Sequence, residues 1–153
     1  NIWMRSAVTA PHLSTAPNSS DFLTMTTKTI GDLGEYEAVR FLKKKRIKPI
    51  VRNYRSGRNE IDIIAGNKEY IIFAEVKTRA LTPGNERFGS AASAVDREKR
   101  RRLIAAAKDY LRENCEIRQP RFDVIEVYLD GSDGKYRVAE INHIENAFGK
   151  NSV

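Results

Sequence analysis

The chain has 153 residues, of which 41% are hydrophobic and 31% are charged, a composition typical of one globular domain and not of a disordered or fibrous chain. Its Lys and Arg residues outnumber its Asp and Glu residues and give a formal net charge of +7, which favours polyanionic partners such as nucleic acid. One cysteine and two distant histidines, Cys115, His12 and His143, exclude an internal disulfide and a zinc site built on these residue types.

The chain begins with a segment that differs from the rest. Residues 1–24 are rich in Ser, Thr, Ala and Pro and carry almost no charge, and they lack the apolar core of a signal peptide. They are interpreted as a disordered leader, as residues foreign to the natural protein or as an upstream extension, with Met25 as a plausible start. A single domain is therefore predicted over residues 25–150.

The first patterned segment predicts a helix over residues 29–46. Apolar residues recur there at spacings of three and four, as on one face of a helix. Thr29 and Asp32 have the spacing of a capping box. The basic run 43–46 suits the negative end of the helix dipole.

Three strands are predicted next, followed by a second helix and two more strands. Alternating or continuous apolar patterns and intervening turn residues predict them. Ser93 and Asp96 have the spacing of a second capping box. The predicted elements are strands 50–55, 60–65 and 70–77, helix 96–113, and strands 121–129 and 135–141. The order α-β-β-β-α-β-β predicts an α/β domain with a mixed five-stranded sheet flanked by helices.

Charged residues stand where this pattern calls for apolar ones. The third strand is apolar until Glu75 and Lys77, which alternation places on one face. Burying such charges costs several kcal/mol per ion unless they are paired or bind a metal. Glu35 shares the apolar stripe of the first helix, and Lys99 that of the second.

Asp62 adds a second acidic residue on the neighbouring strand. A turn centred on Gly66 and Asn67 would set Asp62 opposite residues 71–73 rather than Glu75. Twist or a bulge would then be needed to bring Asp62 and Glu75 together.

Carboxylates that converge on one point bind hard cations such as Mg²⁺. A lysine beside them supplies positive charge where phosphate oxygens gain negative charge, and it can orient a water molecule. Glu75 and Lys77 could equally be a solvated pair on an edge strand, and Lys99 could extend along the surface to reach water. The combination of several carboxylates with lysines in apolar surroundings, rather than any one of these residues, favours phosphodiester hydrolysis.

Several motifs in order along residues 28–148 resemble those of the YraN-like family, a bacterial group similar to Holliday-junction resolvases within the PD-(D/E)xK nuclease superfamily. The motifs are Gly34-Glu35 with Ala38, Asn53 with Arg55, Glu60-Ile61-Asp62-Ile63-Ile64, Phe73 with Glu75-Val76-Lys77 and Arg79, Phe88-Gly89, Ala94-Val95 with Lys99, Ala105-Ala106, Arg121-Phe122-Asp123-Val124, and His143-Ile144 with Asn146-Ala147-Phe148.

The resemblance implies a nuclease-like domain with a restriction-endonuclease-like core. It implies Asp62, Glu75 and Lys77 as catalytic residues with Glu35 as an additional carboxylate, and a Mg²⁺ or Mn²⁺ ion held by Asp62, Glu75 and Glu35. Asn59 replaces the family's usual Gly, and Asn suits a turn position with positive φ. Glu60 is either a further residue of the site or an exposed strand start.

Five basic residues are candidates for nucleic-acid binding, because they flank the predicted site or form a dense run. They are Arg79, Arg87, Lys99, Arg100 and Arg101. Contacts from such residues to phosphate do not depend on sequence. A solvated helix face is the alternative for either basic run, 43–46 or 99–102.

The expected function is that of a metal-dependent endonuclease acting on DNA, with branched or structured DNA among its substrates. A non-catalytic nucleic-acid-binding module of nuclease fold is the alternative, and a protein-interaction or membrane-surface role is a third. A homodimer is implied by the resemblance only. The lone cysteine and the lack of an apolar run of about 20 residues predict a cytoplasmic protein without membrane association.

Overall fold

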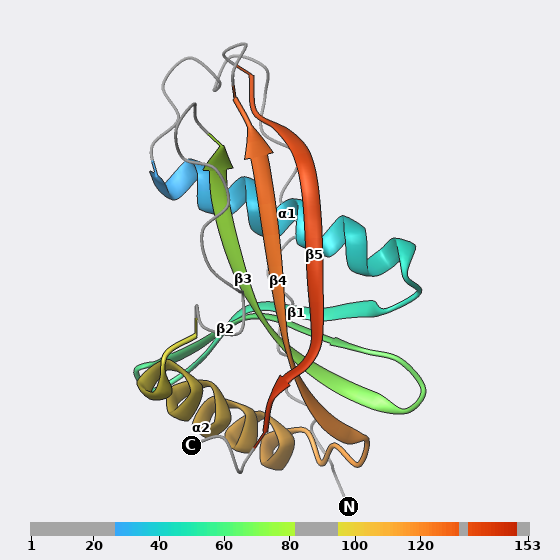
Figure 1. Cartoon of the computed structure of the whole chain (residues 1–153). Coiled ribbons are helices and arrows are strands. Elements are labelled where there is room, and N and C mark those ends of the chain that lie inside the picture. Colours follow the sequence, from blue (N-terminus) through green and yellow to red (C-terminus); the bar gives the residue numbers. More distant parts are fainter. Residues whose placement is uncertain (1–26, 82–94, 132–134, 150–153) are drawn as a thin grey trace, which may run out of the picture.

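A computed structural model describes residues 27–81, 95–131 and 135–149 of the chain. The leader 1–24 and Met25 lie outside these ranges. The elements are α1 (Thr27–Lys44), β1 (Lys48–Ser56), β2 (Asn59–Gly66), β3 (Tyr70–Leu81), α2 (Arg97–Glu113), β4 (Gln119–Asp130) and β5 (Arg137–Phe148). The predicted order α-β-β-β-α-β-β is confirmed (Figure 1).

All five strands form one mixed sheet in the order β1-β2-β3-β4-β5. Neighbouring strands are antiparallel except β3 and β4, which run parallel. A parallel pair needs a crossover connection, and the segment that contains α2 provides it. The β3–β4 register is continuous from Tyr70 opposite Gln119 to Leu81 opposite Asp130.

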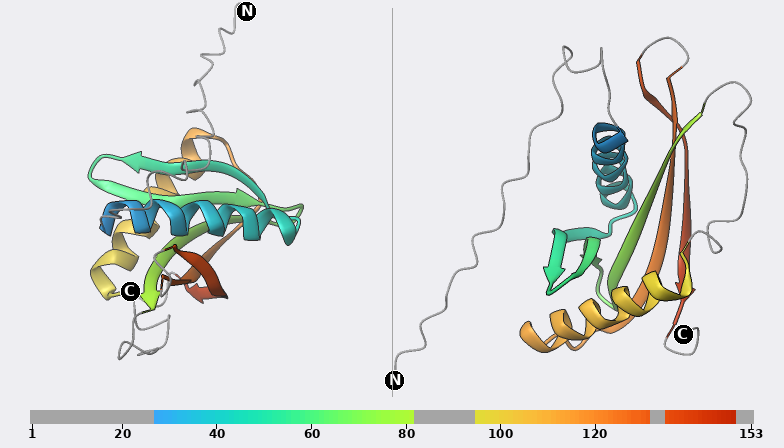
Figure 2. Two further views of the ribbon diagram at one scale, coloured as in Figure 1. Left: turned by 90° about the horizontal axis from the view of Figure 1, so that it is seen from above. Right: turned by 90° about the vertical axis from the view of Figure 1, so that its left-hand side faces the viewer.

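The two helices cover opposite faces of the sheet, at different heights (Figures 1 and 2). The face under α2 contains one apolar cluster, centred on Phe73, Leu103 and Phe122. The other face contains a second cluster, in which Leu42 of α1 packs with Ile72 and Ile125. In Figure 1, α2 covers only the lower part of its face, and no helix of the described ranges covers the upper part of β3 and β4 on that face.

Both helices begin at residues other than those predicted. Thr29 lies inside α1, which includes Thr27, so the capping box predicted from Thr29 and Asp32 is wrong. In α2 the N-cap is Asp96, whose carboxylate accepts a hydrogen bond of 2.8 Å from the Lys99 backbone N–H. Ser93, the other residue of the second predicted box, lies outside the described ranges. Neither helix combines the length and apolarity needed to cross a membrane.

The last strand is much longer than predicted. It ends at Phe148 rather than at residue 141. Two irregularities lie in the part that was missed: the pairing with β4 shifts between Phe122 and Val124, and Asn146 has a φ of 51°. Such an irregularity interrupts the alternation by which a strand is recognised. The interpretation of Asn59 is also wrong: Asn59 begins β2 and is not among the residues with positive φ, whereas Gly57 in the turn has a φ of 57°.

Candidate active site

The candidate site lies where β2 separates from β3. Their ladder ends at the pair Ile63 and Ala74, so the backbone of Val76 has no strand partner on that side. The Asp62 carboxylate replaces this partner and accepts a hydrogen bond of 2.7 Å from the Val76 N–H. A side chain thus satisfies a backbone donor that the end of the ladder leaves unpaired.

The register of the hairpin brings Asp62 level with Glu75. Asn67 closes the turn by accepting hydrogen bonds from the backbone N–H groups of Glu69 and Tyr70, and Gly66 pairs with Ile71. Continuing that register sets Asp62 opposite Glu75. The register predicted from the sequence is therefore wrong, and no bulge is needed to bring the two carboxylates together.

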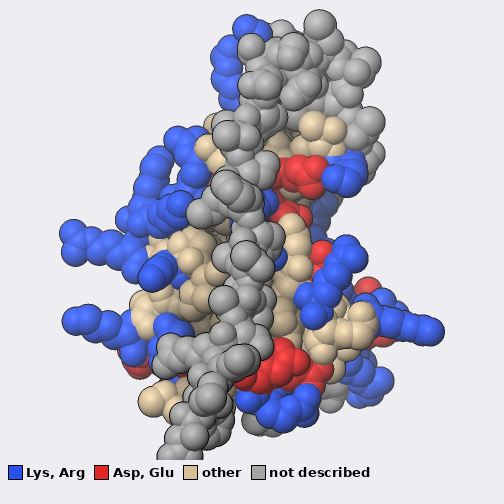
Figure 3. All heavy atoms as spheres, turned by 180° about the vertical axis from the view of Figure 1, so that it is seen from behind, with Lys and Arg blue, Asp and Glu red and all other residues tan. Residues whose placement is uncertain are grey.

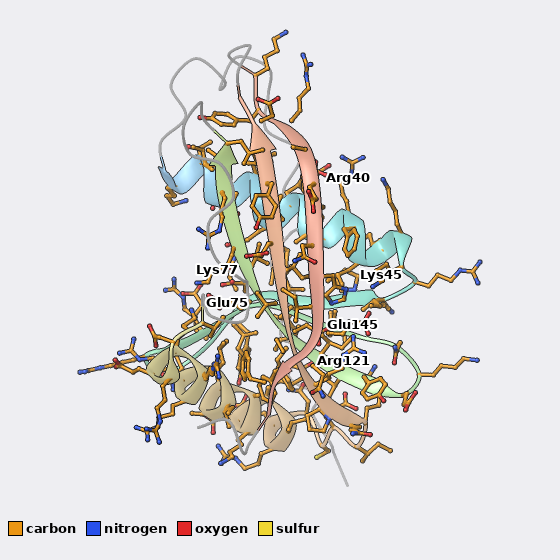
Figure 4. The ribbon with its side chains drawn as sticks, in the orientation of Figure 1. Arg40, Lys45, Glu75, Lys77, Arg121 and Glu145 are labelled. Atoms are coloured by element: carbon orange, nitrogen blue, oxygen red, sulfur yellow. The ribbon has the colours of Figure 1, made fainter. Side chains whose placement is uncertain are left out.

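Glu75 is a buried carboxylate between two lysines. Its side chain is 4% exposed, and its Oε1 lies 2.9 Å from Lys77 Nζ (Figure 4). Its Oε2 lies 3.1 Å from Lys99 Nζ. The contact with Lys99 is one of charge, because Glu75 Oε2 has no hydrogen-bond partner in the described part of the chain. The inward direction predicted for Lys99 is confirmed.

The pKa of Asp62 is raised to about 7 in this environment. Burial is the largest cause and the charge of Glu75 the second, while the hydrogen bond from Val76 and the charge of Lys99 act in the opposite direction and Glu35 adds a smaller rise. A buried carboxylate whose pKa is raised by a neighbouring carboxylate is typical of sites that bind a cation or exchange a proton.

Glu35 approaches this pair from α1. Its carboxylate lies 3.4 Å from an Arg52 nitrogen and is 20% exposed. A Cβ on Gly34 would overlap the side chain of Thr78 on β3, so glycine is what allows α1 to lie so close to the sheet. Gly31, one turn earlier in α1, has room for a Cβ, since nothing lies within 4 Å of that position.

Asp62 and Glu75 fit a divalent cation, because each is a carboxylate held in a poorly solvated position beside the other. Within residues 27–81, 95–131 and 135–149, however, no three acidic, His or Cys side chains are grouped closely enough to hold a metal by themselves. The inclusion of Glu35 as a third ligand stays a prediction. Glu60 lies 3.4 Å from Arg55 and is 38% exposed, which favours the exposed strand start.

The basic residues predicted to bind nucleic acid differ in environment. Arg79 and Arg101 are exposed, and Arg87 lies outside the described ranges. Arg100 donates a hydrogen bond of 2.8 Å to the Val95 carbonyl and lies over the Phe148 ring, so it contributes to the packing of α2. Seen from the α1 side, Lys and Arg side chains project from both flanks of the molecule rather than from one patch (Figure 3).

A second polar network joins β4 to β5 on the face under α1. Asp123, which is fully buried, accepts hydrogen bonds from Arg121, from the Asn146 N–H and, at 2.8 Å, from His143 Nε2. Lys45 Nζ lies 3.0 Å from the other His143 nitrogen. Figure 4 shows Lys45 and Arg121 apart from Glu75 and Lys77. His143 is thus a buried member of a network that joins strands, and Asp123 within the apolar run 122–129 was the sequence signal for this network.

Three relatives and one family profile resemble the chain over most of its length. The profile of uncharacterised protein family UPF0102 matches residues 34–127. The UPF0102 protein of Caldanaerobacter subterraneus subsp. tengcongensis is 41% identical over 122 residues, which is 79% of this chain and 95% of that protein. Those of Clostridioides difficile and Moorella thermoacetica are 43% and 39% identical, cover 81% and 82% of this chain, and are each matched over 100% of their own length.

Proposed function

The chain belongs to the uncharacterised protein family UPF0102, the YraN-like family indicated by its motifs, and we propose that it is a divalent-metal-dependent endonuclease that hydrolyses phosphodiester bonds in DNA. The observation that supports this proposal is the pairing of Asp62 and Glu75 with the Lys77 ammonium 2.9 Å from the Glu75 carboxylate. Two neighbouring carboxylates with one lysine beside them are the groups that metal-assisted phosphodiester hydrolysis needs.

In the proposed reaction Asp62 and Glu75 hold Mg²⁺ or Mn²⁺, and Glu35 assists from α1. The ion supplies positive charge opposite the scissile phosphate when it is bound. Lys77, which is 31% exposed, donates to a phosphate oxygen and orients the attacking water. Lys99, at 33% exposed, approaches the same point from α2 and contacts the phosphate together with Arg79.

DNA is the proposed substrate because the chain has a net charge of +7 and exposed basic residues near Lys77. Arg79 lies two residues beyond Lys77 on β3, and Arg101 lies in the first two turns of α2. Contacts of this kind bind the phosphate backbone and weaken as salt is raised. A preference for branched DNA and a homodimer both follow from the resemblance to resolvases.

Cleavage of labelled linear, single-stranded, flap and four-way-junction DNAs, with matched RNAs, tests the proposal in Mg²⁺ or Mn²⁺. Asp62→Ala should abolish cleavage, and Lys77→Ala should slow it by about 100-fold or more, as expected for the loss of a charge that stabilises a transition state. Lys108→Ala is the matched control, because Lys108 is an exposed lysine of α2. Cleavage that persists in excess EDTA, or in Asp62→Ala, would contradict the mechanism.

A binding module without catalysis is the second candidate, and the environment of Glu75 favours it. Lys77 and Lys99 already neutralise this carboxylate, so the site is stable as an ion-pair cluster without a metal. This candidate predicts DNA binding that is unchanged by Mg²⁺ and by Asp62→Ala. Wild-type protein that binds DNA in this way, and cleaves no member of the panel, would establish it over the endonuclease.

A further inference from the structure

A buried carboxylate on β4 has one oxygen without a hydrogen-bond partner within the described ranges. Glu126 is 2% exposed. Its Oε2 accepts hydrogen bonds of 3.0 Å from the Tyr128 hydroxyl and 3.3 Å from Asn142 Nδ2. Its Oε1 is buried and has no hydrogen-bond partner within the described ranges. A buried carboxylate oxygen without a partner is costly, so Glu126 calls for an explanation other than packing.

Glu126 lies next to Lys77 on the same face of the sheet. The two residues are paired in the continuous parallel register of β3 and β4, and paired residues of neighbouring strands point to the same side. The stacked rings of Phe73 and Phe122, 5.6 Å apart, lie on this face, four residues earlier on each strand. Lys77 therefore has two acidic neighbours on this face: Glu75, two residues earlier on β3, and Glu126, its partner on the adjacent strand β4.

Among the described residues, the ammonium of Lys77 is paired with the Glu75 carboxylate. Its nitrogen lies 2.9 Å from Glu75 Oε1. A divalent cation bound to Glu75 would occupy that carboxylate and repel the ammonium. Lys77 must then turn either to water or to another acceptor. Glu126 Oε1, on the adjacent strand, is an acceptor without a hydrogen-bond partner in the described part of the chain.

We propose that Glu126 is a positioning residue that receives the Lys77 ammonium when a divalent cation takes the Glu75 carboxylate. This inference rests on the proposed metal-dependent function. Tyr128 and Asn142 hold Glu126 through its Oε2, which leaves Oε1 directed to a second donor. Metal loading and the placement of the lysine are then coupled, and Lys77 stays at the site instead of swinging into solvent.

A double-mutant cycle on Mg²⁺ affinity tests the coupling without any measurement of cleavage. The probe is Mg²⁺ alone, titrated by calorimetry into wild type, Glu126→Gln, Lys77→Met and the double variant. Gln keeps the shape of Glu126 and an acceptor for Tyr128 and Asn142. Glu126→Gln should weaken binding roughly tenfold, as for the loss of one charged hydrogen bond. In the Lys77→Met background the same substitution should change affinity less than about twofold.

The alternative is that Glu126 attracts the cation directly through its charge. Glu126→Gln would then weaken Mg²⁺ binding equally with or without Lys77, and this result would overturn the inference. Glu140→Gln is the matched control, since Glu140 is paired with Tyr128 on β5 and has the same charge. It should leave the affinity unchanged if the effect is specific to Glu126.

A crystal structure of the wild-type protein with Mg²⁺ provides a second test that needs no variant to fold. Lys77 Nζ should lie within hydrogen-bonding distance of Glu126 Oε1. Lys77 that remains on Glu75, or that points into solvent, while Mg²⁺ is bound would overturn the inference and leave the proposed function intact. Wild-type protein that binds no Mg²⁺ would instead contradict the proposed function, and with it this inference.

Discussion

Raising the pH should destabilise the metal-free protein through Asp62. Its pKa is raised from 3.8 to about 7, so between these values the folded state binds a proton that the unfolded state has released. The free energy of unfolding therefore falls as the pH rises through this window, and it levels off above about pH 8. Asp62→Asn removes the titration and keeps a side-chain oxygen that can accept from the Val76 N–H.

The size of the effect follows from the shift. A pKa that moves from 3.8 to about 7 changes the free energy of unfolding by at most about 4 kcal/mol, since each tenfold change in proton affinity is worth about 1.4 kcal/mol. Asp62 is only half-buried, and the neighbouring charges of Glu75 and Lys99 can rearrange in response. We therefore expect Asp62→Asn to be more stable than wild type by about 2 kcal/mol at about pH 8, and by almost nothing near pH 4.

Urea denaturation followed by far-UV circular dichroism in EDTA, at several pH values, measures this difference. Asp32→Asn is a suitable control, because Asp32 lies on the exposed side of α1 and pairs with Lys28 at the surface. Stability curves of wild type and Asp62→Asn that run parallel from about pH 4 to about pH 8 would show this expectation to be wrong. They would mean that Asp62 is not held in a poorly solvated position beside Glu75.

Three further predictions concern the metal, the second polar network and the approach of α1. Mg²⁺ should raise the Tm of wild type more at pH 8 than at pH 5, since protonated Asp62 binds metal poorly, and it should not raise the Tm of Asp62→Asn. Burial raises the pKa of Asp123, but hydrogen bonds from His143 and Arg121 outweigh it and hold that pKa below its usual range. Asp123→Asn should therefore cost about 3 kcal/mol in urea denaturation at neutral pH, and the difference should shrink as the pH falls below about 4; an unchanged difference at low pH would contradict this expectation. Gly34→Ala should cost about 1–3 kcal/mol through overlap with Thr78, and Thr78→Ala should recover part of that loss; no recovery would locate the clash elsewhere.

Much of the fold could be predicted from the sequence, because the patterns that define it are local. The order of elements, the buried third strand and the inward direction of Lys99 all follow from alternation or from helical spacing over a few residues. The helix ends and the length of β5 could not be predicted in the same way. The irregularity at Asn146 depends on a hydrogen bond to the distant residue Asp123, and at the start of α2 two acceptable N-cap residues, Ser93 and Asp96, lie three residues apart in the sequence.

The residues of the candidate site could be predicted, but their arrangement could not. Asp62, Glu75 and Lys77 stand out as charges in apolar strands and Glu35 as a charge on an apolar helix stripe, and the motif resemblance assigned them to one site. The separation of β2 from β3, which turns Asp62 toward Val76, cannot be predicted from the sequence. The same is true of the pairing of Lys77 with Glu126 between the parallel strands β3 and β4. Glu126 itself could have been noticed as a lone acidic residue in the apolar run 124–129.

The class of fold, the family and the presence of charged residues among apolar ones all follow from the amino-acid sequence, since each depends on residue types at short spacing. Which of those charges meet is a property of the folded chain. Strand register fixes whether two carboxylates lie opposite one another, and a shift of one residue turns a side chain to the other face. The Asn67 turn set that register here, and it brought Asp62 level with Glu75 where a count along the chain had kept them apart.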